Sequence, residues 1–313
     1  MDTISVVIPT YNEEGNIIKG YERVKNVFRE LPNYQYEMLF IDNCSTDRTR
    51  EILRKLAEED SQVKCIFNAK NFGWTRSSFY GIISTTGDCT VLLAADMQEP
   101  PEKIIEFVAE WEKGFKIVIG IKSKSNENKL KYYLRNCYYR FIGSIAETEH
   151  IKQFMGFGLY NKEFVNVLRG LDDPMPYLRG IVAELGYTRK EILYTQEKRT
   201  VGKTHFSFFK VYDLAMLGIT SSTKVLMRVA TILGFTVAIT SFIVALVTFI
   251  LKIFNIIDYP TGIAAISIGV FFFGAIQLFF IGLLGEYVLN INTRVIKRPL
   301  VIEEERLNFV DKL

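Results

Sequence analysis

The sequence predicts an α/β domain whose mostly parallel sheet carries helices on both faces, followed by a helical region of different composition. Up to residue 121, short runs rich in Val, Ile, Leu and Phe alternate with longer segments whose apolar residues recur at helical spacing. Near-continuous apolar strands are typical of parallel strands that are buried on both faces. Charged residues are dense up to about residue 228 and nearly vanish until Glu286, which predicts a domain boundary.

The predicted strands are five apolar runs, at 4–8, 36–41, 63–67, 89–95 and 116–121. The segments between them carry the charges and are predicted helices. Ligands of such sheets bind beyond the carboxyl ends of the strands. Polar loops follow the first four strands at that edge: PTYNEE at 9–14, DNCSTD at 42–47, NAKNFG at 68–73 and ADMQEPPE at 95–102. We expect the functional site there, with Ser45 or Thr46 also capping the next helix and Pro100 and Pro101 suiting a helix start.

Motifs that the sequence lacks exclude several functions. Neither GxGxxG nor GxxxxGK[ST] occurs, which argues against dinucleotide and P-loop sites. His150 and His205 are the only histidines, too few for a histidine metal centre or Ser-His-Asp hydrolysis. The four cysteines are far apart and form no CxxC pair, as expected of free thiols in a reducing compartment. A net charge of +3 does not indicate nucleic-acid binding.

The apolar tail predicts two membrane spans, at about 229–251 and 259–285. The first range holds 23 residues without a charge, and the second holds 27 with only Gln277 strongly polar. At about 1.5 Å of rise per residue, each could cross a hydrocarbon core of roughly 30 Å. A pair of buried core helices is the alternative.

Basic residues set the expected orientation. Lys224 and Arg228 precede the first span, Arg294, Lys297 and Arg298 follow the second, and only Lys252 lies between them. The positive-inside rule then predicts an integral protein of the inner, cytoplasmic membrane, with its catalytic domain and both termini in the cytoplasm. The N-terminal sequence has no signal-peptide pattern.

Four segments follow from this organisation: a domain at 1–205, an interfacial amphipathic helix region at 206–228, the two spans within 229–290, and a C-terminal tail at 291–313. An ordinary core helix is the alternative for 206–228. The stretch KLKYYLRNCYYRF at 129–141 mixes bases with aromatics. We predict a helix at lipid headgroups there, in preference to a nucleic-acid surface.

Four motifs in this order and spacing, SVVIPTYNEEGNI, FIDNCSTDRT, NFGWTRSSFYGI and AADMQEPPE, resemble family 2 glycosyltransferases with the GT-A fold. The end of the second apolar range, GLLGEYVLNINTRVIKRP, resembles the polyisoprenyl-phosphate glycosyltransferases, which include the bactoprenol glucosyltransferases and dolichyl-phosphate mannose synthase. The resemblance implies inverting transfer of a sugar from a nucleotide-sugar donor to a polyprenyl phosphate at the cytoplasmic face of the membrane. By similarity we favour UDP-glucose and undecaprenyl phosphate, with GDP-mannose as the alternative donor.

The resemblance also implies roles for individual residues. Nucleotide contacts fall on Pro9, Tyr11, Glu13, Asp42 and Asn71. Asp96 and Gln98 match ligands of Mg²⁺ or Mn²⁺. The phosphate-binding positions are Lys122, Arg135, Arg199, Lys203 and His205. The catalytic set consists of Asp96, Gln98, Arg135 and Arg199. Self-association through the apolar spans is a further expectation, because they contain Gly, Ala and Ser.

The sequence departs from the family pattern at four positions. Ala94 replaces the first Asp of the DxD element, Asn43 an Asp of the second loop, His205 a common lysine, and Phe157 an acidic residue. These departures leave open a catalytically inactive nucleotide-binding scaffold. A processive polysaccharide synthase is disfavoured, because QEKRT at 196–200 lacks the tryptophan of QxxRW. A phosphate acceptor is already largely dianionic near neutral pH, so its attack needs no enzyme base.

Overall fold

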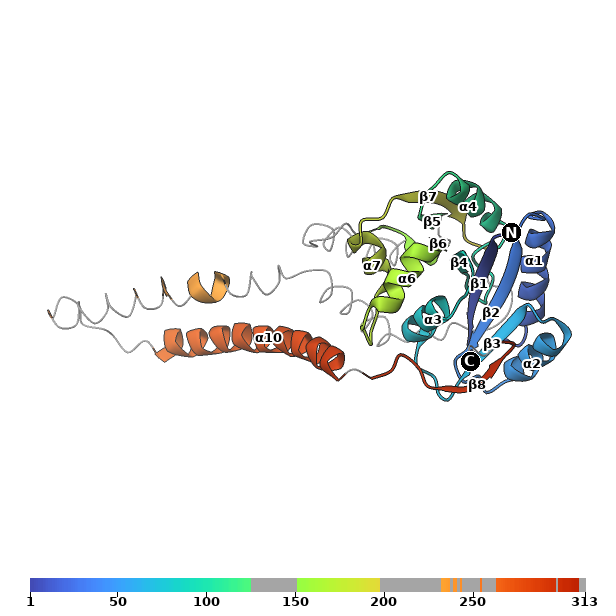
Figure 1. Ribbon diagram of the computed structural model, residues 1–313. Coiled ribbons are helices and arrows are strands. Elements are labelled where there is room, and N and C mark those ends of the chain that lie inside the picture. Colours follow the sequence, from blue (N-terminus) through green and yellow to red (C-terminus); the bar gives the residue numbers. More distant parts are fainter. Residues whose placement is uncertain are drawn as a thin grey trace.

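The structure is a computed structural model that describes residues 1–124, 151–197, 232–236, 239–240, 243, 254, 263–296 and 298–309. Within these ranges the strands form one eight-stranded sheet in the order β7-β5-β6-β4-β1-β2-β3-β8 (Figure 1). The strands are β1 (Thr3–Thr10), β2 (Gln35–Asp42), β3 (Val63–Asn68), β4 (Cys89–Leu92), β5 (Ile117–Lys124), β6 (Phe154–Asn161), β7 (Arg189–Thr195) and β8 (Glu303–Leu307). The helices are α1 (Ile17–Arg29), α2 (Thr49–Glu59), α3 (Trp74–Ile83), α4 (Lys103–Glu112), α6 (Lys162–Gly170), α7 (Leu178–Glu184) and α10 (Ile263–Val295).

The five predicted strands are confirmed as β1 to β5, but the sheet is mixed. β1 pairs in parallel with β2 and β4, and β2 pairs in parallel with β3. The antiparallel strand β6 separates β4 from β5, and β7 then pairs in parallel with β5. Strand β4 ends at Leu92 instead of residue 95, because the chain turns at Met97, whose amide donates to the Ala94 carbonyl at 3.2 Å. The carboxyl ends of β1 to β4 therefore share one edge.

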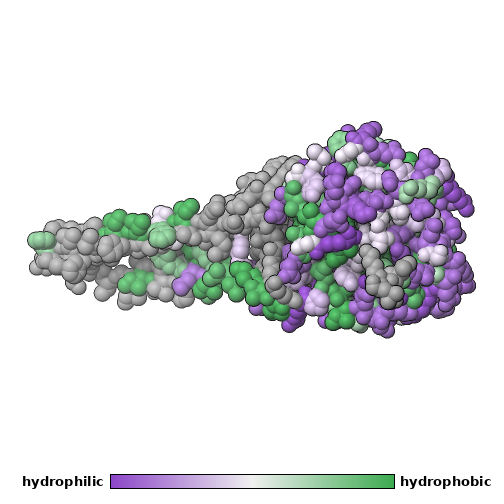
Figure 2. Space-filling model, viewed as in Figure 1, coloured by the Kyte–Doolittle hydropathy of each residue, from purple (hydrophilic) through white to green (hydrophobic). Residues whose placement is uncertain are grey.

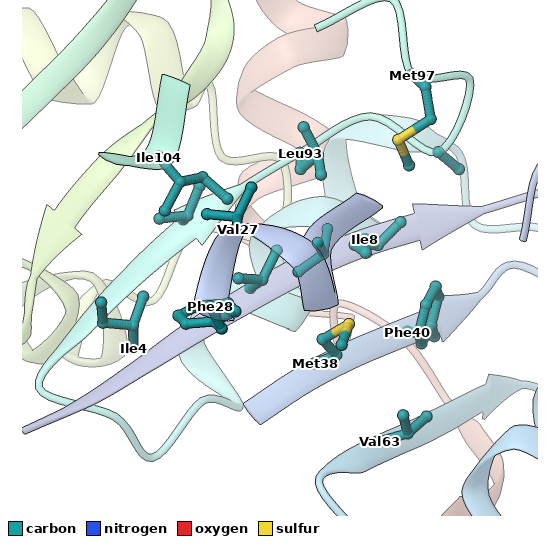
Figure 3. Packing of buried hydrophobic residues seen from close by; sticks show 14 of the residues in the cluster. Ile4, Ile8, Val27, Phe28, Met38, Phe40, Val63, Leu93, Met97 and Ile104 are labelled. Carbon is teal, nitrogen blue, oxygen red and sulfur yellow. The ribbon is translucent and has the colours of Figure 1, made fainter. Parts of the chain in front are cut away.

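Helices cover both faces of the sheet, which confirms the predicted α/β class. Successive strand residues point to opposite faces. Residues Ile4, Ile8, Met38 and Phe40 thus pack with α1, α2 and α4, whereas their neighbours such as Val7 pack with α3, α6 and α7. Figure 3 shows the first of these two cores, with Val27 and Phe28 of α1 lying over β1 and β2.

Helix α1 also touches one of the candidate site loops. Its Gly20 faces Met97, and a Cβ at that glycine would lie 2.5 Å from the Met97 methyl carbon. Met97 is buried in the same core as Ile8 (Figure 3). The loop after β4 is therefore anchored on the hydrophobic core by its methionine, while Asp96 and Gln98 on either side of it are only half-buried.

Gly158 of β6 lies where two backbones approach closely. A Cβ there would meet the Val118 carbonyl oxygen at 2.6 Å and the Ile119 Cα at 3.1 Å, both in β5. Because backbone atoms cannot swing away as a side chain can, we expect Gly158→Ala to lower the free energy of unfolding by about 3 kcal/mol. Gly170→Ala is the matched control, because its Cβ would meet nothing within 4 Å. Urea unfolding that gives equal stabilities for the two variants would contradict this packing argument.

The structure contradicts the predicted membrane hairpin and the integral-membrane localisation that depends on it. Among the residues that the structure describes, no helix is both long enough and apolar enough to cross a membrane. Residues 259–262 lie outside the described residues, and helix α10 continues from Ile263 through Glu286 to Val295, so the described part of the apolar stretch does not form a separate helix of its own. The range 229–251 lies mostly outside the described residues, and 206–228 lies wholly outside them.

Helix α10 projects from the sheet domain with its C-terminal end nearer to the sheet, and residues 298–309 continue from that end to the sheet (Figure 1). Its exposed side chains include Leu278, Phe279 and Leu289. Figure 2 shows hydrophilic residues gathered over the sheet domain and hydrophobic ones along the projecting part. The chain returns from α10 to the edge of the sheet as β8, which the sequence did not predict.

Candidate active site

Each of the four loops at the carboxyl edge contains one residue in a left-handed backbone conformation. The φ angles are 54° at Asn12, 64° at Cys44, 86° at Gly73 and 53° at Met97. Three of these residues are not glycine, and such residues adopt positive φ only where the surrounding structure requires it. These loops are therefore sharply folded at the edge where the sequence predicts the site.

Hydrogen bonds join the first two loops. The Asn12 amide donates to Ser45 Oγ at 2.9 Å, and Asn12 Oδ1 accepts from the Thr46 amide at 2.8 Å. The Glu13 amide donates to Thr49 Oγ1 at 2.9 Å. The prediction that Ser45 or Thr46 caps a helix is wrong, because α2 begins at Thr49 and these side chains bind the neighbouring loop instead.

Asp42 lies beneath these loops with its side chain fully buried. Its carboxylate accepts hydrogen bonds from the Ser45 amide, at 3.0 Å, and the Ser45 hydroxyl, and Arg50 Nε lies 3.4 Å from Asp42 Oδ2. Burial raises the pKa of Asp42, although the Ser45 hydrogen bonds and the Arg50 charge oppose the rise. Contact of Asp42 with a base or ribose stays a prediction. The structure shows the carboxylate holding the second loop.

Asn43 ties the second loop to the third. Its Oδ1 accepts from the Phe72 amide at 2.9 Å and from Asn68 Nδ2 at 3.3 Å, and its Nδ2 donates to Asn71 Oδ1 at 2.9 Å. An aspartate could not donate to Asn71. The departure from the family pattern at this position is therefore part of a hydrogen-bonded support for Asn71, a predicted nucleotide contact.

Phe157, another of the departures from the family pattern, belongs to the core. It is 1% exposed, and its ring centroid lies 4.9 Å from that of Phe107 and 5.3 Å from that of Tyr194. An acidic side chain at this place would be buried among aromatic rings without a polar partner, at a cost of several kcal/mol. The residue has a packing role here.

The fourth loop carries the predicted metal ligands. Asp96 Oδ1 accepts from the Gln98 amide at 3.2 Å. Gln98 Oε1 accepts from Gln196 Nε2 at 3.1 Å, and the Glu197 amide donates to the Gln98 carbonyl oxygen at 2.9 Å. In the described part of the chain, no three His, Cys, Asp or Glu side chains form a metal-binding group. One carboxylate and one amide oxygen nevertheless fit a hard cation whose remaining ligands are substrate phosphates and water.

Glu99 is a residue that the sequence analysis missed. It is buried, and its Oε2 accepts from the Ala94 amide at 3.0 Å. Burial raises the pKa of Glu99 to about 8, and the nearby charge of Asp96 adds to the rise. A carboxyl group thus lies against the backbone of Ala94, the position where the DxD pattern has its first Asp. A charged residue directly before two prolines was the only available signal.

The remaining predicted residues are distributed as follows. Pro9 is buried at the end of β1, Tyr11 and Glu13 are half-buried in the first loop, and Asn71 is exposed. Lys122 lies in β5, paired in register with Tyr194 of β7, which is the strand at the far edge of the sheet from β3. Arg135, Arg199, Lys203 and His205 lie outside the described residues, so their roles stay predictions.

The family model of "Glycosyl transferase family 2" matches residues 5–185, which include most of β1, strands β2 to β6 and all four loops. The chain belongs to glycosyl transferase family 2. One relative is a bactoprenol glucosyl transferase of Shigella phage SfX, 31% identical over 97% of this chain and 99% of its own length. An uncharacterised glycosyltransferase of Synechocystis is 29% identical over 96% of this chain and 94% of its own.

Among solved structures, the glucosyl-3-phosphoglycerate synthase of Mycobacterium tuberculosis, in complex with Mn²⁺, UDP and phosphoglyceric acid, is similar with a TM-score of 0.44. The two chains are 16% identical, and the match covers 70% of this chain and 76% of that one.

Proposed function

We propose that this family 2 glycosyltransferase transfers a sugar from a nucleotide-sugar donor to a polyprenyl phosphate. UDP-glucose is the favoured donor and undecaprenyl phosphate the favoured acceptor. The observation that carries the proposal is that hydrogen bonds join the first three loops at the carboxyl ends of the strands, where the fourth loop also lies with its half-buried Asp96. The acceptor class is supported by the bactoprenol glucosyl transferase that matches over nearly the full chain.

The donor nucleotide would bind on the first and third loops. Tyr11, Glu13 and Asn71 have accessible surface there, and each belongs to a loop that hydrogen bonds fix to the second loop. A site whose groups are already held in place binds with less loss of conformational entropy. Pro9 and Asp42, which are buried, would support this surface from below.

Asp96 and Gln98 would hold Mg²⁺ or Mn²⁺ against the donor diphosphate. When bound, the cation supplies neutralisation of the negative charge that develops on the leaving nucleoside diphosphate. Gln98 would have to share its amide oxygen with Gln196, which now donates to it. Arg199 and Lys203 are proposed as further donors to the phosphates, and Lys122, Arg135 and His205 as contacts to donor or acceptor phosphate.

The chemistry needs no carboxylate base. A phosphate monoester has a second pKa of about 6 and is largely dianionic at neutral pH. Its oxygen would attack the anomeric carbon in line, forming one C–O bond while the bond to the nucleoside diphosphate breaks, with inversion of configuration. The packing roles of Asn43 and Phe157 weaken the alternative of an inactive scaffold, because neither residue needs loss of activity to explain it.

The first experiment is transfer of labelled sugar from UDP-glucose, UDP-N-acetylglucosamine and GDP-mannose to undecaprenyl phosphate in detergent. We expect lipid-linked label, highest from UDP-glucose, that falls to background with EDTA and returns with Mg²⁺ or Mn²⁺. Highest transfer from GDP-mannose would keep the reaction and change the donor. Nucleotide binding without transfer from any donor would contradict the proposed activity.

A further inference from the structure

The C-terminal segment after α10 completes the sheet beside β3. Strand β8 pairs antiparallel with β3, and Figure 1 shows it at the edge next to α2. The Ala69 amide donates to the Ile302 carbonyl at 2.9 Å, and Asn308 Nδ2 donates to the carbonyls of Ala57 and Val63 at 2.6 and 2.9 Å. These bonds fix the strand by its backbone and one amide side chain.

Two adjacent glutamates of β8 each pair with an arginine of α2. Glu304 Oε2 lies 2.7 Å from Arg50 Nη2, and Glu305 Oε2 lies 2.7 Å from Arg54 Nη2. Both guanidinium groups lie over the Phe67 ring, at 5.1 Å for Arg50 and 4.7 Å for Arg54. The two pairs are therefore alike in residue type, distance and aromatic neighbour.

The two arginines differ in what lies on their other side. Arg50 Nε is 3.4 Å from the buried Asp42 carboxylate, whereas no ion pair joins Arg54 to Asp42 in the described part of the chain. Arg50 Nε is itself buried and has no hydrogen-bond acceptor among these residues. Its position thus depends on the two carboxylates that contact the guanidinium, Asp42 at Nε and Glu304 at Nη2.

Asp42 connects Arg50 to the loops of the candidate site. Its carboxylate accepts from the Ser45 amide and hydroxyl, and Ser45 Oγ in turn accepts from the Asn12 amide at 2.9 Å. Asn12 is the left-handed residue of the first loop and stands between Tyr11 and Glu13. A continuous series of contacts therefore runs from Glu304 through Arg50, Asp42 and Ser45 to the nucleotide loops.

We infer that Arg50, held by Glu304 of the C-terminal strand, is a positioning residue that fixes the first two loops for binding of the donor nucleotide. The assignment of the ligand as a nucleotide rests on the proposed function. The C-terminal strand then contributes to donor affinity, although the ion pair of Glu304 is made with α2 and not with either of these loops. Loss of the Glu304 charge releases Arg50 to turn toward solvent, and Asp42 then keeps only its Ser45 and Thr10 donors.

The test compares Glu304→Gln with Glu305→Gln in the full-length protein. Hydrogen exchange without nucleotide measures loop order directly, and we expect about fivefold faster exchange of amides 11–13 and 43–46 in Glu304→Gln alone. Affinity for UDP is expected to fall about fivefold in the same variant, with a raised donor KM and kcat within about twofold. Arg50→Lys, which keeps the charge, should lose less UDP affinity than Arg50→Gln.

Equal exchange in the two glutamate variants would overturn the inference, as would equal UDP affinity if the wild type binds UDP, since a purely structural strand would respond alike to loss of either pair. Thermal unfolding serves as the check that both variants fold, and similar midpoints are expected. A difference in exchange together with no UDP binding by the wild-type protein would keep the positioning role and refute the UDP donor. The two failures are thereby distinguishable.

Discussion

Replacement of Asp96 by Asn is expected to lower kcat for sugar transfer about 10³-fold, equivalent to roughly 4 kcal/mol in the activation free energy. Asp96 is the first carboxylate after β4 and has accessible surface, whereas Glu99 of the same loop is buried. An asparagine keeps the acceptor for the Gln98 amide but removes the charge that the proposed cation needs. The measurement is single-turnover transfer at saturating donor and Mg²⁺, together with the affinity for UDP in the presence and absence of Mg²⁺.

Asp88→Asn is the matched control. Asp88 precedes the same strand at its other end, where it accepts from the Thr3 amide at 3.0 Å and pairs with Lys162 at 3.0 Å. We expect this variant to keep full transfer activity. If Asp96→Asn retained more than about a tenth of wild-type kcat, or if Mg²⁺ strengthened UDP binding equally in the variant and the wild type, Asp96 could not be the metal ligand.

The strands that the sequence predicts are those whose own run of apolar residues is enough to indicate a buried strand. β1 to β3 are buried on both faces and are long apolar runs, so period and composition suffice. β6 was missed because Gly156 and Gly158 lower its strand propensity, although Gly158 is there for the close approach of β5. β8 was missed because four of its five residues, EEER, are charged, and charged residues have low strand propensity.

The location of the candidate site at the carboxyl ends of the strands was predictable from the sequence. The role of each residue there was not. A pattern places Asp42, Asn43 and Asp96 at strand ends without telling which carboxylate is buried. Burial depends on contacts across the loops, such as those of Asn12 with Ser45 and Thr46, between residues more than thirty positions apart in the chain. The Arg50 contact with Glu304 spans 254 positions, beyond any local signal.

The amino ends of the strands, opposite the candidate site, contain a buried charged group that no sequence motif marks. Glu37 of β2 is 4% exposed and accepts hydrogen bonds from Ser5 Oγ, from the Thr86 amide at 2.7 Å and from Thr86 Oγ1 at 2.8 Å. Lys64 of β3 pairs with the same carboxylate. Burial alone would raise the pKa of Glu37, but Lys64 and the hydroxyl and amide donors outweigh it and lower the pKa.

Glu37→Gln is expected to lower the free energy of unfolding at pH 7 by about 3 kcal/mol, because it leaves the largely buried Lys64 ammonium without a countercharge. The lowered pKa fixes the sign of the pH dependence: the stabilisation is present above the unfolded pKa of about 4.3 and is lost as the pH falls through the lower, folded value. Urea unfolding at pH 7 and below pH 4 should therefore show a difference between variant and wild type that shrinks with acid.

The control is Glu59→Gln, whose pair with Lys55 is 4.0 Å long and solvent-exposed, and which we expect to change stability by less than about 0.5 kcal/mol. If the Glu37→Gln protein were as stable as Glu59→Gln, the ion pair with Lys64 would contribute nothing net to stability, and the neutral hydrogen bonds alone would stabilise this end of the sheet. Such a result is known for buried pairs whose desolvation cost cancels their attraction.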